Sequence, residues 1–189
     1  MKGITVRKVI LYMQTSLNGY AIGEDEEDMD WLKVSDQTWE LVNGLQERCD
    51  TALIGRVTYD DFVGFWPGAA DDDSLPEGMR SHSRWLTASE KIVFSSKKGK
   101  SDWDNTRYVT NLNGVKKLKD GKGKDLLLLG GVGLANEFMS NDLIDEYYVL
   151  LNPGTTVTGL SLFKTKLDLK LLDAKPFESG VVALHYGRA

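Results

Sequence analysis

A glycine-rich turn, Gly130-Gly131-Val132-Gly133, stands where an apolar run meets a helix-forming segment. Glycines let the backbone turn sharply and approach a ligand closely. The first amides of a helix have no partners within it, and the helix dipole adds positive charge there. A strand, this turn and a helix in succession therefore predict an anion site suited to a pyrophosphate. The same glycines could also serve tight packing alone.

The turn differs from the two common phosphate-binding motifs. Asn136 stands where the dinucleotide-binding fingerprint has its third glycine, and no ribose-binding acid follows a second strand. No Gly-Lys-Ser/Thr follows the turn, which excludes a Walker phosphate loop.

Residues 54 to 59 form a second segment that suits phosphate. A predicted strand ends at Gly55, and a helix begins directly after it. Arg56 offers a planar fork that matches phosphate, and Thr58 adds a hydroxyl in the first helical turn. A solvent-facing arginine and a capping threonine are the alternative interpretation.

A third segment follows the next predicted strand. Ser95, Ser96, Lys97 and Lys98 combine hydroxyl and ammonium groups that suit a phosphate monoester, whereas an acid would favour an unphosphorylated ribose. These residues favour NADPH over NADH, although a plain polar loop would have the same composition.

The elements that position these segments alternate along the chain. We predict strands at 9–13, 51–54, 91–94, 107–110, 126–129 and 146–151, helices at 35–49, 57–65, 80–88, 115–119 and 134–139, a loop at 67–77, and an antiparallel pair at 167–172 and 181–186. Alternating strands and helices form a mainly parallel sheet with right-handed crossovers. Because such sheets bind ligands at the carboxyl ends of their strands, we expect the three segments to meet there.

Bulk composition narrows the class of protein. A length of 189 residues suits one domain, spanning residues 1–189, and the net charge of −5 disfavours a nucleic-acid partner. Cys49 is the only cysteine, so neither an intramolecular disulfide nor a cysteine-based zinc site forms, and we predict no metal. No apolar run approaches the roughly 20 residues of a membrane span, and the N-terminus lacks a signal peptide, so a cytoplasmic protein is expected.

The chain resembles the dihydrofolate reductase-like superfamily, and most closely the reductase domain of the bifunctional riboflavin-biosynthesis deaminase-reductases and its stand-alone relatives. Each shared segment is short, but all occur in the same order over nearly the whole chain. The segments are MQTSLNGY (13–20), IGRVTY (54–59), KIVFSS (91–96), LGGVG (129–133), LIDEY (143–147) and TGLSLF (158–163).

The resemblance implies a three-layer αβα sandwich around a mixed sheet, with NADPH bound for hydride transfer and a homodimer as the assembly. It places the phosphates at Arg56 and Thr58 and the adenosine side at Ser95 and Ser96. The remaining cofactor contacts that we expect are Gly55, Lys97, Gly130, Gly131 and Gly133, with Ser16 to Gly19 beside the nicotinamide.

The chain differs from the family pattern at two places near the expected reaction centre. The family's Ser-Leu-Asp-Gly motif has Asn18 at its third position here, so an amide replaces a carboxylate. The proline-containing run that precedes the pterin-binding acid of dihydrofolate reductases is absent. Asp30 and Asp36 remain weak candidates for the proton donor, beside a bound water, and Asp36 also suits a first-turn helix acid.

Few other residues suggest a substrate contact or a competing chemistry. Trp31 and Trp66 could stack on a flat heterocycle, with Asn18 as a further substrate contact, although tryptophans are more often core residues. His82 and His185 have no nucleophile motif nearby, and Cys49 suits a core position. The acidic run 24–30 lacks the glycine and spaced ligands of a calcium loop.

Two hypotheses follow for function. The first is an NADPH-dependent reductase of a small heterocyclic or ribose-bearing compound, similar to 5-amino-6-(5-phosphoribosylamino)uracil reductase or dihydrofolate reductase. The alternative is a non-catalytic nucleotide-binding or regulatory protein on the same fold. In both cases the expected partner is a small molecule, without nucleic acid or membrane.

Overall fold

The computed structural model describes residues 6–22, 29–97 and 99–189. Lys98 and residues 24–28 of the acidic run lie outside this part. The elements follow in the order β1 (Val9–Thr15), β2 (Tyr20–Ile22), α1 (Asp36–Glu47), β3 (Cys49–Gly55), α2 (Arg56–Ala69), α3 (Glu77–Ala88), β4 (Glu90–Phe94), β5 (Thr106–Val109), α4 (Val115–Lys119), β6 (Asp125–Gly130), α5 (Val132–Ser140), β7 (Glu146–Leu151), β8 (Leu160–Ser161), β9 (Leu169–Pro176) and β10 (Val182–Arg188).

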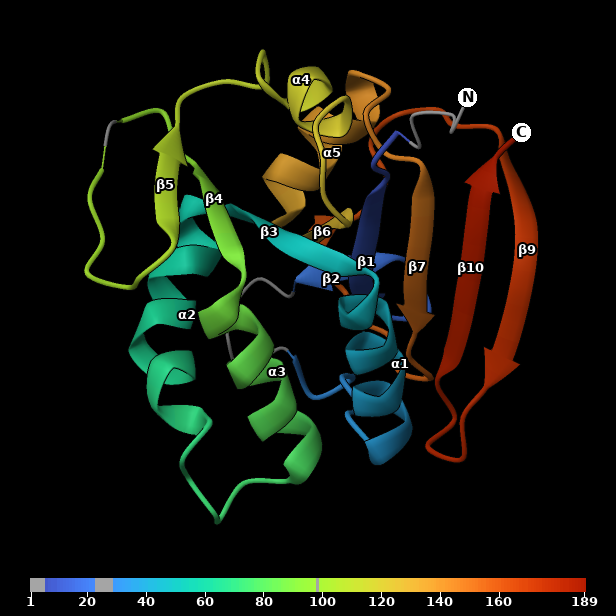
Figure 1. The fold of residues 1–189 in the computed structure, drawn as a ribbon. Coiled ribbons are helices and arrows are strands. Elements are labelled where there is room, and N and C mark those ends of the chain that lie inside the picture. The colour runs from blue at the N-terminus through green and yellow to red at the C-terminus, as the bar shows by residue number, and fades with distance from the viewer. Residues whose placement is uncertain (1–5, 23–28, 98) are drawn as a thin grey trace, which may run out of the picture.

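Eight strands form one sheet in the order β5-β4-β3-β6-β1-β7-β10-β9 (Figure 1). The first six pair in parallel, whereas β10 pairs antiparallel with both β7 and β9. This arrangement confirms the predicted mixed sheet with an antiparallel C-terminal hairpin.

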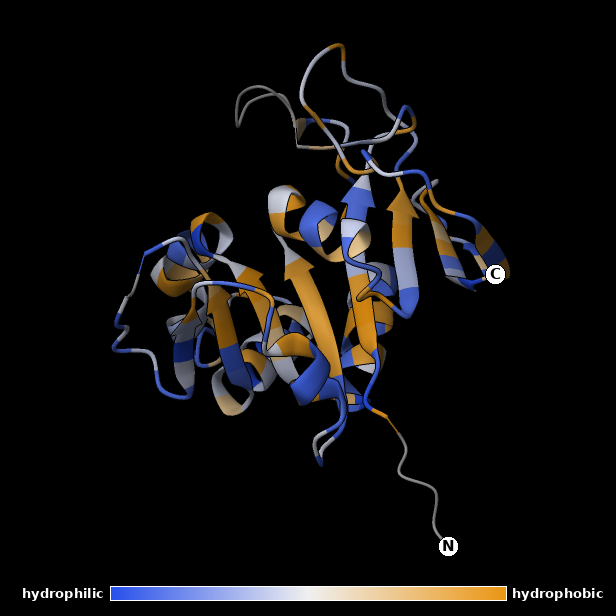
Figure 2. Cartoon of the chain, turned by 90° about the horizontal axis from the view of Figure 1, so that it is seen from above, coloured by the Kyte–Doolittle hydropathy of each residue, from blue (hydrophilic) through white to orange (hydrophobic). Residues whose placement is uncertain are grey.

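Helices cover both faces of the sheet, and alternation along the strands decides which side chains they bury. On one face, Ile10 and Leu127 pack with Leu45 of α1. On the other face, Leu128 packs with Phe138 of α5. The central strands are the most hydrophobic elements (Figure 2), as expected for parallel strands buried on both sides. The predicted three-layer αβα sandwich is therefore confirmed.

Three details differ from the sequence-based expectation. Cys49 is the first residue of β3 and is buried there, instead of ending α1. Helix α2 continues through Pro67 to Ala69, where a loop was expected, because packing of Trp66 among aromatic rings outweighs the helix-breaking tendency of proline. The two-stranded sheet of β2 and β8 is too short to leave a periodic pattern.

His82 on α3 is buried between Trp39 and Trp66, with ring centroids 5.8 and 4.6 Å away. Its Nδ1 pairs with Gln46 Nε2, so the ring accepts this hydrogen bond in its neutral form. Burial lowers the pKa of His82 to about 4. This setting agrees with a structural role.

The depressed pKa of His82 predicts acid sensitivity. Between pH 6.5 and about 4 the unfolded chain binds a proton that the folded chain excludes, so stability should fall as pH falls through this window. Urea unfolding at stepped pH should show this slope, and a His82→Gln variant should lose it. An NMR titration placing the His82 midpoint near 6.5 would contradict the prediction.

No helix in the described residues is both long enough and apolar enough to span a membrane.

Candidate cofactor site

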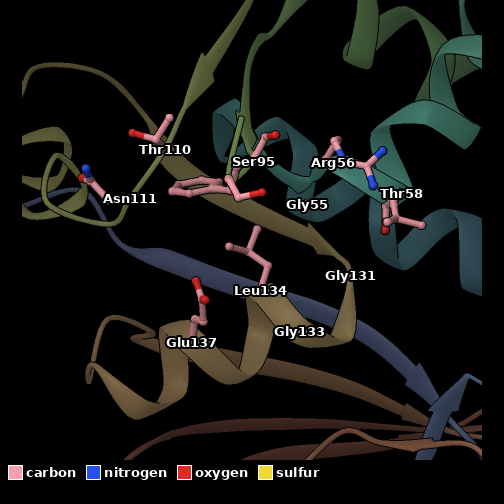
Figure 3. A pocket seen from close by; sticks show the side chains of 13 residues that line it. Gly55, Arg56, Thr58, Ser95, Thr110, Asn111, Gly131, Gly133, Leu134 and Glu137 are labelled. Atoms are coloured by element: carbon pink, nitrogen blue, oxygen red, sulfur yellow. The ribbon is translucent and has the colours of Figure 1, made fainter. Parts of the chain in front are cut away.

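A cavity of about 420 Å³ lies at the carboxyl ends of β3, β4 and β6 (Figure 3). This volume falls within the range of small-molecule sites. The three segments singled out in the sequence meet here, as predicted, although they are far apart along the chain. The lining residues are Gly55, Arg56, Val57, Thr58, Phe94, Ser95, Ser96, Thr110, Asn111, Gly131, Gly133, Leu134 and Glu137.

Two helices begin at this cavity. Gly55 is the N-cap of α2 and Gly131 is the N-cap of α5, and neither helix start has a side-chain cap. The first backbone amides of α2 and α5 are therefore free of side-chain acceptors, and the positive ends of both helix dipoles point to the cavity. This pair of helix starts, together with nearby hydroxyls, is suited to bind an anion.

The two glycine turns are in close contact. A Cβ on Gly55 would lie 3.1 Å from the backbone nitrogen of Gly131, and a Cβ on Gly131 would lie 3.0 Å from Thr58 Oγ1. Gly130 has a φ of +135°, which side-chain-bearing residues rarely adopt. The Gly130–Gly131 peptide bond is cis. Glycine is therefore required here for both conformation and space.

We expect Gly131→Ala to weaken dinucleotide binding by at least about tenfold, or roughly 1.4 kcal/mol. The added methyl group crowds Thr58 Oγ1 at the place where a phosphate would approach the α5 amides. Gly44→Ala is the matched control, because a Cβ there meets nothing within 4 Å and Gly44 does not line the cavity. Fluorescence titration of NADPH measures the effect, and thermal unfolding checks the fold. Unchanged affinity in the Gly131 variant would contradict the prediction.

Arg56 lies at the rim of the cavity and is half-exposed. Its guanidinium forms an ion pair with Asp60, one turn further along α2. Figure 3 shows Arg56 and Thr58 at one end of the cavity and Asn111 and Glu137 at the other. An incoming phosphate would compete with Asp60 for Arg56.

The far end of the cavity has a mixed polar lining. Ser95 and Ser96 line the cavity as predicted, whereas the exposed Lys97 is not among the lining residues. Sequence reasoning missed Thr110, Asn111 and Glu137. Glu137 follows Gly133 by four residues, so helical spacing could have placed both on one face. Thr110 and Asn111 follow strand β5, whose carboxyl end lies along the same sheet edge.

The Ser16 to Gly19 loop does not line this cavity. Ser16 is buried, and its hydroxyl donates to Asn18 Oδ1 at 2.9 Å. Asn18 Nδ2 donates to the carbonyl of Thr156 at 2.7 Å, which ties the loop to a distant segment. Gly19 takes a φ of +86° and lines a different cavity. The Asn18 amide therefore holds the loop in shape.

The structure does not bring the aromatic and acidic candidates to the cavity. Trp31 is 5% exposed and packs beside Gly154, while Trp66 packs against Phe62 and Phe65. Burial of large apolar rings accounts for both positions. Asp30 and Asp36 are exposed and do not line the cavity, and Asp36 occupies the first turn of α1.

The fold and the converging glycine turns define a dihydrofolate reductase-like α/β protein. The model of the RibD C-terminal domain family matches residues 7–183, and the chain belongs to this family. Protein YyaP of Bacillus subtilis (strain 168) is 32% identical over 187 residues, covering 95% of this chain and 94% of YyaP.

Solved structures share the fold. A putative riboflavin biosynthesis protein from Shewanella sp. PV-4 has a TM-score of 0.73 at 21% identity, covering 96% of this chain and 99% of that one. RibD of Acinetobacter baumannii has a TM-score of 0.69 at 13% identity, covering 98% of this chain and 58% of that one. This chain therefore corresponds in length to little more than half of that RibD chain.

Proposed function

We propose that this chain is an NADPH-dependent reductase of a small heterocyclic or ribose-bearing compound. The observation that carries the proposal is the convergence of two uncapped helix starts, at Gly55 and Gly131, on one cavity. Family membership supports it, as does the printed name of a neighbour from Thermotoga maritima, a deaminase and 5-amino-6-(5-phosphoribosylamino)uracil reductase.

The residues present fit a dinucleotide. The first amides of α2 and α5 would hold the pyrophosphate, with Thr58 as an added hydroxyl donor. Arg56 would bind a further phosphate in exchange for Asp60. Ser95 and Ser96 would bind on the adenosine side.

A bound dihydronicotinamide would supply a hydride to an electrophilic carbon of the substrate. The task of this chain is then orientation and exclusion of water. The apolar side chains of Phe94 and Leu134 line the cavity between its polar ends, and both are more than nine-tenths buried. They limit the water that reaches a bound ligand.

Titration of the purified protein with NADPH and with NADH tests the proposal. We expect enhanced nicotinamide fluorescence, tighter binding of NADPH, and oxidation of NADPH when 5-amino-6-(5-phosphoribosylamino)uracil or a related carbonyl or imine heterocycle is added. Binding of NADPH without turnover of any such compound would favour the non-catalytic nucleotide-binding alternative. Equal affinity for NADPH and NADH would show that Arg56, Ser95 and Ser96 do not bind the 2′-phosphate of NADPH.

We also propose that the chain forms a homodimer through its C-terminal strands. Leu171 on β9 is 51% exposed and pairs with Tyr186, next to a cavity of about 490 Å³ whose lining includes Val149, Leu151 and Leu184. An exposed leucine beside a cavity with apolar lining residues is typical of the apolar face at an interface between proteins. A second copy supplies the same apolar face about a two-fold axis.

Leu171→Asp should convert the dimer to a monomer, because it places a charge in the apolar interface. Leu172→Asp is the matched control, because Leu172 is as exposed as Leu171. Leu172 lies against Gly187, and Gly187 is on the opposite face of the sheet from its neighbour Tyr186. Size-exclusion chromatography with light scattering measures the mass. A monomeric wild-type chain, or equal dissociation by both variants, would contradict the proposal.

A further inference from the structure

A second cavity, which we call the basic cavity, lies between the β4–β5 edge of the sheet and helix α4. Its volume of about 450 Å³ is sufficient for a small molecule. The floor is apolar and consists of Ile92 and Phe94 from β4, Val109 from β5, and Val115 and Leu118 from α4. A flat ring would therefore find hydrophobic contacts on both the sheet side and the helix side.

Cations surround this apolar floor. Arg7, Arg107, Lys117 and Lys122 line the basic cavity, and no carboxylate does so among the residues that the structure describes. Arg7 and Arg107 hold ion pairs with carboxylates outside the lining. Lys117 and Lys122 are exposed, and within residues 6–22, 29–97 and 99–189 neither takes part in an ion pair.

The local charge contrasts with the rest of the molecule. The chain has a net charge of −5, and the cofactor cavity combines one cation, Arg56, with one carboxylate, Glu137. The basic cavity has four cations around an apolar floor instead. Low-dielectric walls lined by one sign of charge concentrate counter-ions of the opposite sign. The fitting ligand is therefore an anion with an aromatic body.

We propose that the basic cavity binds a small aromatic phosphate, with its ring on the floor and its phosphate near Lys117 and Lys122. Phe94 and Asn111 line both this cavity and the cofactor cavity. An occupant of one cavity therefore restricts the side chains available to the other, and we expect the two ligands to weaken each other's binding. This coupling rests on the proposed cofactor site, whereas binding of the aromatic phosphate does not.

Calorimetric titration of the whole chain with 1-naphthyl phosphate tests the proposal, with 1-naphthol and inorganic phosphate as matched probes. We expect 1-naphthyl phosphate to bind at least about tenfold more tightly than either fragment, because only the whole molecule uses both the floor and the cations. The double variant Lys117→Gln/Lys122→Gln should weaken binding by about fivefold to tenfold. Lys116→Gln/Lys170→Gln removes the same charge outside the lining and should change it less than about twofold.

A third variant shows which of the two cavities 1-naphthyl phosphate occupies. Arg56→Ala alters only the cofactor cavity and should leave binding of 1-naphthyl phosphate unchanged. Weaker binding in Arg56→Ala, with no effect of Lys117→Gln/Lys122→Gln, would overturn the proposal, because the probe would then occupy the cofactor cavity. Equal losses in the two double-lysine variants would also overturn it, since they would reveal attraction by net charge alone.

Discussion

Arg56→Ala should weaken binding of NADPH by about 1–3 kcal/mol and should affect NADH much less, because the variant removes a charge-assisted hydrogen bond to phosphate. Arg56 lies at the rim of the cavity, beside Thr58 and the glycine turn. Its planar fork can meet two phosphate oxygens at once, which a lysine cannot do.

The ion pair of Arg56 suggests a second variant, which we expect to strengthen NADPH binding. Asp60 holds the Arg56 guanidinium in an exposed i,i+4 ion pair, a kind of pair that contributes roughly 0.3–0.5 kcal/mol. Asp60→Asn releases Arg56 from this competition, so we expect NADPH to bind about twofold more tightly. If Arg56→Ala and Asp60→Asn change the affinity for NADPH in opposite directions, the changes reflect phosphate recognition and not general damage to α2.

Fluorescence titrations of NADPH and NADH with each variant measure these shifts. Arg84→Ala is the matched control, because Arg84 is also a half-exposed arginine in an ion pair, on α3 and away from the cavity. Equal losses for NADPH and NADH in Arg56→Ala would show that Arg56 does not read the 2′-phosphate.

Glu146→Gln should lower the free energy of unfolding at pH 7 by about 3 kcal/mol. Glu146 begins β7 and is 7% exposed. It accepts hydrogen bonds from Lys8 at 2.7 Å and from Arg48 at 3.1 Å, and lies 3.1 Å from the ring of His185. Burial alone would raise the pKa of Glu146, but the bonds from Lys8 and Arg48 outweigh it and hold this pKa at about 2.

The pH dependence gives the sign of this contribution. The unfolded carboxyl titrates near 4.5 and the folded one near 2, so the stabilisation is complete above 4.5 and is lost as pH falls towards 2. Wild type and Glu146→Gln should therefore differ in urea unfolding at pH 7 and converge in acid. Their cofactor affinities should agree, since Glu146 lies at the amino ends of the strands, opposite the cavity.

Glu90→Gln is the control for this variant. Glu90 pairs with Arg107 on the surface, and exposed pairs contribute about 0–1 kcal/mol. A loss of less than about 1 kcal/mol in both variants would show that the Glu146 cluster contributes no more than a surface ion pair.

The sequence by itself predicted a mainly parallel sheet buried on both faces, because strands alternate with helices and four consecutive leucines form a strand that has no polar side. The three-layer αβα sandwich was implied by the family resemblance. The sequence also predicted that the segments around Gly55, Ser95 and Gly131 share one edge, since parallel strands end at the same side of a sheet. The positions of glycines and the order of strands and helices are local properties, so they can be predicted from a single sequence.

Only the tertiary structure decided which side chains complete the site. Asn111 enters the cavity because β5 pairs with β4, a long-range contact that has no local signal, whereas Glu137 lies about one helical turn beyond Gly133 on α5. Trp66 is drawn into the aromatic cluster between α1, α2 and α3, and Asn18 is bound to a segment more than 130 residues away. Such positions depend on long-range packing and hydrogen bonding, which residue types along one segment do not specify.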